Sequence, residues 1–336
     1  MTDTKHLHDI ARGYVKTALL RTAFELRIFD PLDGGGLSAV ELAEYADVHP
    51  RGMRILCDAL SAIGLLRAEE GRYQLPEEGS ELLISTSPSF FGGAVRLGAS
   101  DWEWDAQKHL VDAVRHGGTV QPTHALTPEF DYWQEFAHST SWFNNGAAQL
   151  MTDRLVPWAA ERDSVDVLDI ACSHGSYGFT FARAEPRATI TGLDWPGVLD
   201  ITERHAEELG VADRFRKLPG DMFKTPLGGP YDLVMLTNVL HHFAEAEATV
   251  LLKRAHAALK PGGRIAVVGH SYDAGDTPHT NPLPFMFSVI MLVQTHDGET
   301  HSVDAYRRML TDAGFAHPSS HASEAAMHRL FLADRP

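Results

Sequence analysis

From residue 164 onward the sequence alternates short apolar segments with longer segments of helical character. Five apolar segments follow one another: VDVLDIAC (165–172), TITGLD (189–194), FRKLPGD (215–221), YDLVMLTNVL (231–240) and GGRIAVVGH (262–270). Two further strand candidates lie near 317–323 and 326–333. Repeated strand–helix units with continuous apolar strands predict an α/β fold, a doubly wound parallel sheet with helices on both faces. In such sheets the ligand binds beyond the carboxyl ends of the strands.

Acidic residues lie toward the ends of three of these strands. Asp169 lies near the end of the first strand, Asp194 ends the second and Asp221 ends the third. A carboxylate in the second position can accept hydrogen bonds from both hydroxyls of a ribose. Met222 and Phe223 follow Asp221 and suit an adenine ring. The loop after the first strand contains no lysine or arginine, so we expect a nucleoside-containing ligand without a diphosphate, which argues against NAD or ATP.

The N-terminal third has a different pattern. Residues 13–30 place apolar side chains on one helical stripe, and Ser38 with Glu41 has the spacing of a capping box. A further helix after Pro50 and two short strand-like pieces around Gly71 complete the pattern of a winged helix. Residues 38–84 carry four basic and nine acidic side chains, a local charge of −5 that disfavours DNA binding. We expect a packing or dimerisation module.

The middle of the chain is rich in aromatic residues and shows no strand-type alternation. We expect several helices there, and Trp133, Trp142 and Phe143 are candidates to cover a substrate pocket. The predicted organisation is a dimerisation domain at 1–100, a helical linker that contributes to the substrate pocket at 101–160, and a ligand-binding domain at 161–336.

Composition excludes several classes of protein. The net charge is −16, which makes nucleic acids and anionic membranes poor partners. The two cysteines are far apart, and no histidine spacing typical of a metal site stands out, so we expect neither a disulfide nor a metal. The polar start lacks the apolar core of a signal peptide, and the apolar run 283–293 is too short to span a bilayer. A cytoplasmic location is predicted.

These motifs together resemble the class I S-adenosylmethionine-dependent small-molecule O-methyltransferases, the family of plant caffeate and bacterial polyketide-tailoring enzymes. The resemblance covers nearly the whole chain and implies a Rossmann-like, mostly parallel sheet with an antiparallel last strand, behind a winged-helix dimerisation domain. It implies S-adenosyl-L-methionine as cofactor, with S-adenosyl-L-homocysteine as product. It assigns the following residues to cofactor binding: Asp169, Ala171, Ser173, Gly175, Asp194, Trp195, Asp221, Met222, Phe223 and Thr237.

The first motif of that family has glycines where this chain has Ala171 and Ser173. Each replacement costs about 1 kcal/mol if the backbone φ is positive there. The departure leaves open a second hypothesis: an enzyme of this fold that binds the cofactor but methylates carbon or nitrogen, or catalyses a reaction without methyl transfer. A third hypothesis, a DNA-binding regulator that senses the cofactor, is disfavoured by the acidic winged helix.

By the resemblance, the catalytic base falls on His241 in LTNVLHHF (236–243), with His242 as the adjacent alternative. A phenol titrates near 10, so a histidine that titrates near neutrality can take its proton as the oxygen attacks the methyl group. The family flanks this base with two glutamates. The first falls on Gly269, beside His270, and is missing; the second falls on Glu299, which would orient His241. The methyl donor is already activated, so this reaction needs no metal.

The segment FMFSVIMLVQT (285–295) corresponds to the helix that lines the substrate pocket in the family. It supplies five candidate substrate contacts: Phe285, Met286, Val289, Ile290 and Met291. A small, aromatic hydroxyl compound of secondary metabolism is the predicted substrate. The predicted partners are this small molecule and a second copy of the chain in a homodimer, with no nucleic acid and no membrane.

Overall fold

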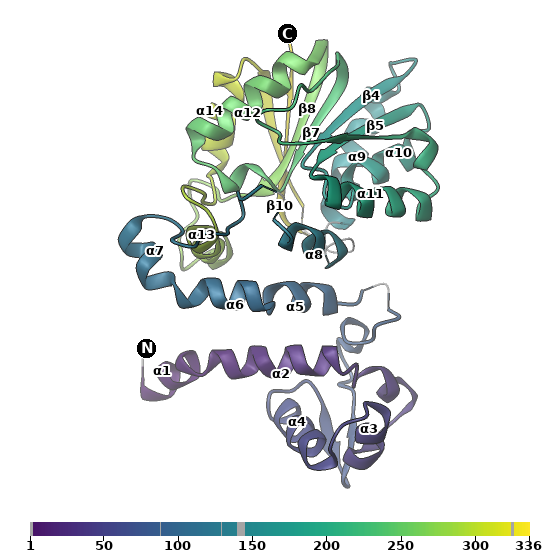
Figure 1. Ribbon diagram of the computed structural model, residues 1–336, viewed down its shortest axis with the longest axis vertical. Coiled ribbons are helices and arrows are strands. Elements are labelled where there is room, and N and C mark those ends of the chain that lie inside the picture. Colours follow the sequence, from purple (N-terminus) through teal and green to yellow (C-terminus); the bar gives the residue numbers. More distant parts are fainter. Residues whose placement is uncertain (1–2, 88, 129, 140–144, 324–325) are drawn as a thin grey trace. The chain divides into compact units, whose positions relative to one another are not determined.

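The computed structural model describes residues 3–87, 89–128, 130–139, 145–323 and 326–336. The chain divides into two compact units, Met1–Trp104 and Asp105–Pro336 (Figure 1). The helix α6 (Asp101–Lys108) contains the division point.

The first unit contains mainly helices and one small sheet. Its elements are α1 (Thr4–Ala11), α2 (Gly13–Glu25), η1 (Asp30–Gly34), β1 (Leu37–Ser38), α3 (Ala39–Tyr45), α4 (Pro50–Ala62), β2 (Arg67–Glu69), β3 (Arg72–Gln74), η2 (Ser80–Leu82) and α5 (Gly92–Gly98). The predicted capping box begins α3, because Ser38 Oγ accepts from the Glu41 N–H and the Glu41 carboxylate accepts from the Ser38 N–H. Phe29, Met53 and Leu60 are buried in its core. The predicted helices and hairpin are confirmed.

The second unit is built on a seven-stranded sheet. Its order is β6-β5-β4-β7-β8-β10-β9, and β4 to β8 are mutually parallel. The last strand, β10, is antiparallel to both of its neighbours. The strands are β4 (Val165–Ile170), β5 (Ala188–Asp194), β6 (Phe215–Pro219), β7 (Tyr231–Thr237), β8 (Leu259–His270), β9 (Ala316–Ser323) and β10 (Ala326–Asp334). The predicted α/β fold is therefore confirmed, including the antiparallel last strand.

Helices cover both faces of this sheet (Figure 1). The helical elements are α7 (Leu110–His116), α8 (Tyr132–Ser139), α9 (Asn145–Ala159), α10 (Ser176–Ala184), α11 (Pro196–Glu208), η3 (Ala212–Arg214), η4 (Leu240–His242), α12 (Glu245–Ala258), α13 (Pro282–Gln294) and α14 (Val303–Asp312). One apolar core joins α12 and α14 to the strands, and a second joins α9, α10 and α11 to them. Two covered faces explain why the central strands are apolar along their whole length.

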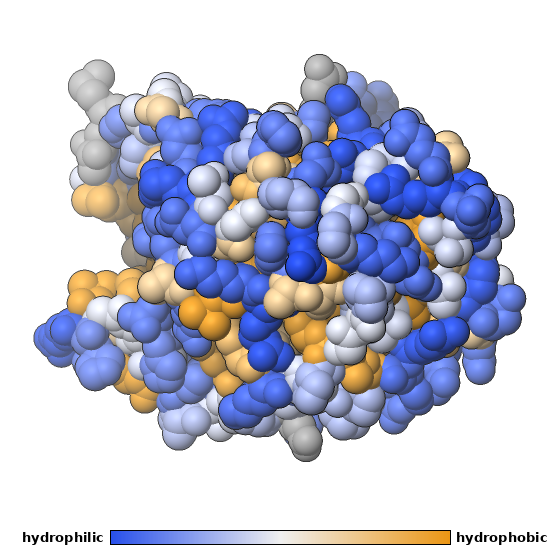
Figure 2. Space-filling model, turned by 90° about the horizontal axis from the view of Figure 1, so that it is seen from above, coloured by the Kyte–Doolittle hydropathy of each residue, from blue (hydrophilic) through white to orange (hydrophobic). Residues whose placement is uncertain are grey.

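None of the helices in the described ranges has both the length and the apolar character that a membrane span requires. Hydrophilic residues dominate the face shown in Figure 2, and apolar ones are scattered between them.

Candidate active site

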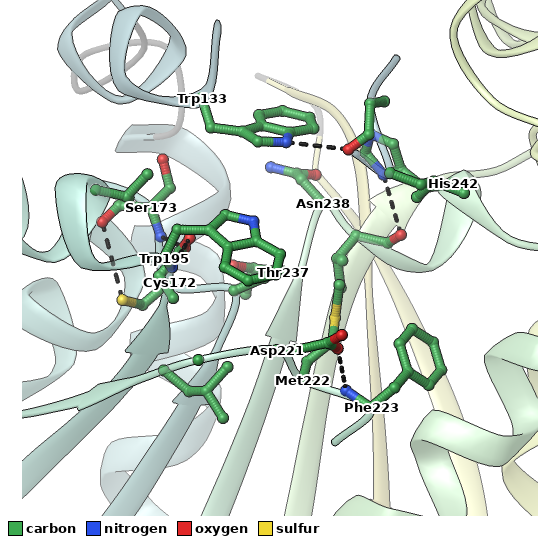
Figure 3. Close-up of a pocket in the computed structure, with 18 of the residues that line it drawn as sticks. Trp133, Cys172, Ser173, Trp195, Asp221, Met222, Phe223, Thr237, Asn238 and His242 are labelled. Carbon is green, nitrogen blue, oxygen red and sulfur yellow. Dashed lines mark hydrogen bonds between the residues drawn. The ribbon is translucent and has the colours of Figure 1, made fainter. Parts of the chain in front are cut away.

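A cavity of about 250 Å³ lies at the carboxyl ends of β4, β5, β6 and β7. Nine of the predicted site residues line it: Trp133, Ala171, Ser173, Asp194, Trp195, Asp221, Met222, Phe223 and Thr237. Figure 3 shows Ser173 and Trp195 on one side of this cavity, Asp221 to Phe223 at its base and His242 on the opposite side. The structure therefore brings the strand ends together as the parallel topology requires.

The loop between β4 and α10 has left-handed backbone at both positions where the family has glycine. Ala171 has φ 56° and Ser173 has φ 51°, so the condition for backbone strain is met at each. The glycine that remains, Gly175, has φ 79°, and a Cβ there would lie 2.3 Å from the Phe179 ring. Of these three positions, only Gly175 therefore combines left-handed backbone with a lack of space for a side chain.

Asp169 lies beneath this loop, and it is not among the residues that line the cavity. Its side chain is 1% exposed and accepts a hydrogen bond from the Gly178 N–H. Burial raises the pKa of Asp169 to about 7, and the negative charge of Asp194 adds to the increase. Asp169 thus supports the start of α10 from below.

Asp194 joins the ends of two strands. Its carboxylate accepts one hydrogen bond from the Ser173 N–H and one from the Trp195 N–H, each at 2.8 Å. Desolvation outweighs these two hydrogen bonds and raises the pKa of Asp194 to about 6. At the next strand end, Asp221 accepts from the Phe223 N–H at 2.8 Å and pairs with Lys224. Both carboxylates accept hydrogen bonds from the backbone of adjacent loops, and both line the same cavity.

Two adjacent histidines in η4 follow strand β7. His242 lines the cavity, and its Nδ1 lies 3.1 Å from the carbonyl oxygen of Val239. A carbonyl can only accept, so Nδ1 carries the hydrogen and Nε2 is left as an acceptor. His241 is 3% exposed, and its Nδ1 has no hydrogen-bond partner among the described residues. Burial lowers the pKa of His242 to about 4 and that of His241 well below 6.5, so both rings are neutral at pH 7.

Helix α13 approaches His241 through a residue that sequence reasoning missed. The Phe287 ring is perpendicular to the His241 ring, with 4.9 Å between their centres. Of the five predicted contacts on α13, Met286 is 63% exposed and Met291 is buried. Phe285, Val289 and Ile290 are half-buried, and none of the five lines the cavity described above. Helix α13 is apolar around most of its circumference, so its sequence does not reveal which face meets His241.

Among the described residues that were predicted for the site, Gly175, His241 and Glu299 do not line the cavity either, although His242, next to His241, does. Trp142 and Phe143 lie outside the described residues. Glu299 is exposed in the segment between α13 and α14, and no hydrogen bond joins it to His241 in the part of the chain that the structure describes.

Asn238 lines the cavity and was also missed by sequence reasoning. It follows Thr237 directly, has φ 55° and donates from Nδ2 to the Tyr177 hydroxyl at 3.2 Å. Its position at a strand end was the available signal, since every polar residue just beyond a parallel strand is a site candidate.

Comparison with known proteins agrees with this geometry. The O-methyltransferase domain family matches residues 107–316, and the O-methyltransferase dimerisation domain matches residues 8–85. The chain belongs to the O-methyltransferase family. The tetracenomycin polyketide synthesis 8-O-methyl transferase TcmO of Streptomyces glaucescens is 30% identical over 314 residues, which cover 91% of this chain and 90% of that one.

Two solved structures show the same fold over the full length of this O-methyltransferase. A protein of Nostoc punctiforme, whose name assigns it to the O-methyltransferases, has a TM-score of 0.92 at 30% identity and covers 100% of both chains. Human N-acetylserotonin methyltransferase, solved in complex with S-adenosylmethionine, has a TM-score of 0.83 at 26% identity, covering 99% of this chain and 98% of that one.

Proposed function

We propose that this protein transfers a methyl group from S-adenosylmethionine to the oxygen of a small aromatic hydroxyl compound of secondary metabolism, with His241 as the general base. The observation that carries the proposal is the position of a buried, neutral histidine pair directly after β7, beside a cavity lined by the acids of β5 and β6. The polyketide-pathway relative TcmO supports the substrate class.

The cavity fits the proposed cofactor. All four proposed contacts line it: in the proposal Asp194 accepts the ribose hydroxyls, and Asp221, Met222 and Phe223 contact the adenine. Ser173 Oγ is buried with no hydrogen-bond partner among the described residues, so it is available to a bound ligand. Thr237, Trp195 and the backbone of the loop from Ala171 to Gly175 complete the proposed cofactor contacts. When bound, S-adenosylmethionine supplies a methyl group on a positively charged sulfur.

His241 is suited to remove a proton because burial keeps its ring neutral well below pH 7. The phenol hydroxyl would donate its proton to this ring as its oxygen becomes nucleophilic, and the closed surroundings would hold the two in line. On the substrate side we propose Trp133, Trp142, Phe143 and the residues of α13, with Phe287 against the base.

We also propose that the protein is a homodimer. The match of residues 8–85 to the dimerisation domain of the family supports this assembly. Light scattering at micromolar concentration is expected to give twice the mass of the 336-residue chain, and a monomer would contradict the proposal.

The activity is tested by incubating the protein with methyl-labelled cofactor and a panel of phenols. We expect the label on oxygen, and a fall in kcat of at least about 100-fold for His241→Ala with unchanged affinity for S-adenosylhomocysteine. Label on carbon or nitrogen, or cofactor binding without any transfer, would instead support the second hypothesis raised by Ala171 and Ser173.

A further inference from the structure

Four more histidines surround His241. His242 precedes α12, His270 ends β8, His328 lies near the start of β10 and His301 lies just before α14. His241, His242, His301 and His328 are each at most 8% exposed, and His270 is half-buried. Burial lowers the pKa of His241 most, and the other four histidines lower it further, in the order His242, His270, His328 and His301.

Neither acid of the family pattern accompanies this histidine group. At position 269 a Cβ would lie 2.4 Å from the Tyr306 hydroxyl, so the space for a side chain there is already filled. Tyr306 is fully buried, and its ring stacks on Phe331 at 4.3 Å. The other acid offered by the family pattern, Glu299, is exposed to solvent.

Two of the four histidines are held by backbone carbonyls. The Nδ1 of His242 is bound to Val239, and the Nε2 of His301 lies 3.0 Å from the carbonyl oxygen of Phe243. His270 has a different setting. Its ring lies 5.7 Å from that of His241, and ring nitrogens lie outside the ring centre, so a small rotation or one water can join them.

Two neighbouring rings, those of His328 and Phe287, contact the His270 ring. His270 and His328 are paired across β8 and β10, and their ring centres are 4.5 Å apart. The Phe287 ring lies 4.1 Å from His270 and also contacts His241. His241, His270 and His328 therefore form a row, although no three His, Cys, Asp or Glu side chains in the described ranges are arranged to hold a metal ion.

We propose that His270 is the positioning residue of His241 and the first acceptor of the proton that His241 takes, with His328 behind it. This inference rests on the proposed base. The substrate O–H bond breaks and its proton passes to His241, then to His270 and on to solvent, so His241 returns to its neutral form. A neutral imidazole thus takes the place that a carboxylate has in the family pattern.

The experiment compares His270→Phe, His270→Asn and a control, His256→Phe. Phenylalanine keeps the ring that packs on Phe287 but removes both nitrogens, whereas asparagine keeps a polar group that can accept a hydrogen bond. His256 is a half-buried histidine on α12 that also packs on a phenylalanine, Phe315, with the two rings perpendicular and 5.0 Å between their centres. We expect a kcat lowered about 10- to 100-fold for His270→Phe, partial recovery for His270→Asn, and wild-type kcat for the control.

A second measurement does not depend on catalysis. Histidine ring nitrogens are titrated by NMR in ¹⁵N-histidine-labelled protein, and His241 is assigned by loss of its signal in His241→Ala. Because His270 is among the groups that affect the pKa of His241, the titration midpoint of His241 is expected to change in His270→Phe. An unchanged midpoint together with unchanged kcat would overturn the proposal.

Failure of this inference can be distinguished from a loss of cofactor binding and from failure of the proposed function. If His270→Phe no longer binds S-adenosylhomocysteine, His270→Asn decides by the same two measurements: unchanged kcat and midpoint overturn the proposal, and changes in both support it. If the wild-type protein methylates no phenol, the proposed function fails, while the NMR titration still shows whether His270 is coupled to His241.

Discussion

The two sides of the site use opposite kinds of buried ionisable group. The ends of β4 and β5 carry carboxylates, with the pKa of Asp169 raised to about 7 and that of Asp194 to about 6. Histidines follow β7, end β8 and lie near the start of the antiparallel β10, with the pKa of His242 and His328 lowered to about 4 and that of His270 to about 3. Desolvation is the largest cause in every case, and it favours the neutral form of both kinds of group.

The difference shows how one sheet edge can separate two tasks. A buried carboxylate regains its charge when a cation or hydroxyl donors approach, so the acidic side is suited to binding a positively charged nucleoside. A buried neutral histidine can accept a proton without first losing one, so the histidine side is suited to base chemistry. Substitutions on the two sides should therefore affect different measurements.

The largest expected effect is the loss of cofactor affinity in Asp194→Ala. The change removes the acceptor for the ribose and leaves the Ser173 and Trp195 N–H groups without their partner. We expect affinity for S-adenosylhomocysteine, measured by calorimetry, to fall about 100-fold. Asp200→Ala, an exposed acid on α11, serves as the control. Equal affinity in Asp194→Ala and wild type would end the assignment of binding to the acidic side.

The second effect concerns stability in acid. The histidines titrate near 6.5 when unfolded and near 3 to 4 when folded, so the unfolded chain binds more protons between these values. Their contribution is complete above pH 6.5 and is lost as pH falls toward 4. Asp169 and Asp194 act in the opposite direction, because their pKa values are raised on folding and the native state gains protons first.

Thermal unfolding across this pH range measures the balance. His328→Phe removes one histidine contribution, so we expect its loss of stability between pH 6.5 and 4 to be smaller by up to roughly 3 kcal/mol. His279→Phe, at an exposed position, should leave the wild-type dependence intact. A His328→Phe curve parallel to that of wild type would show that this histidine is not kept neutral by the fold.

The acidic side was largely predictable from sequence, and the histidine side was not. Asp194 and Asp221 were found because each ends or closely follows a strand whose neighbours are set by the parallel topology, whereas Thr237 came only from the family pattern. The pairing of His270 with His328 depends on strand register between residues 58 positions apart, which no local pattern encodes. The apolar circumference of α13 likewise hid Phe287, because helical periodicity assigns no face to a helix without a polar stripe.

A smaller effect is expected at the two left-handed positions of the loop. Ala171→Gly and Ser173→Gly each replace a residue with φ above 50° by one that adopts this conformation freely. We expect the free energy of unfolding, measured in urea, to rise by about 1 kcal/mol or less in each. Ala257→Gly, at an exposed position in α12, should lower it by a similar amount. A loss of stability in both loop variants would show that these side chains stabilise the loop.

The smallest effect is expected for Glu299→Gln, the variant for which the structure and the family pattern lead to different expectations. Glu299 is exposed, while the groups that affect the pKa of His241 are its burial and four histidines. Glu299→Gln is therefore expected to change kcat by less than about twofold, because an exposed charge in water interacts weakly with a buried ring. The pH dependence of kcat should also remain that of the wild type. A tenfold fall in Glu299→Gln would mean that the carboxylate turns inward during the reaction, and the base would then resemble the carboxylate-supported form of its relatives.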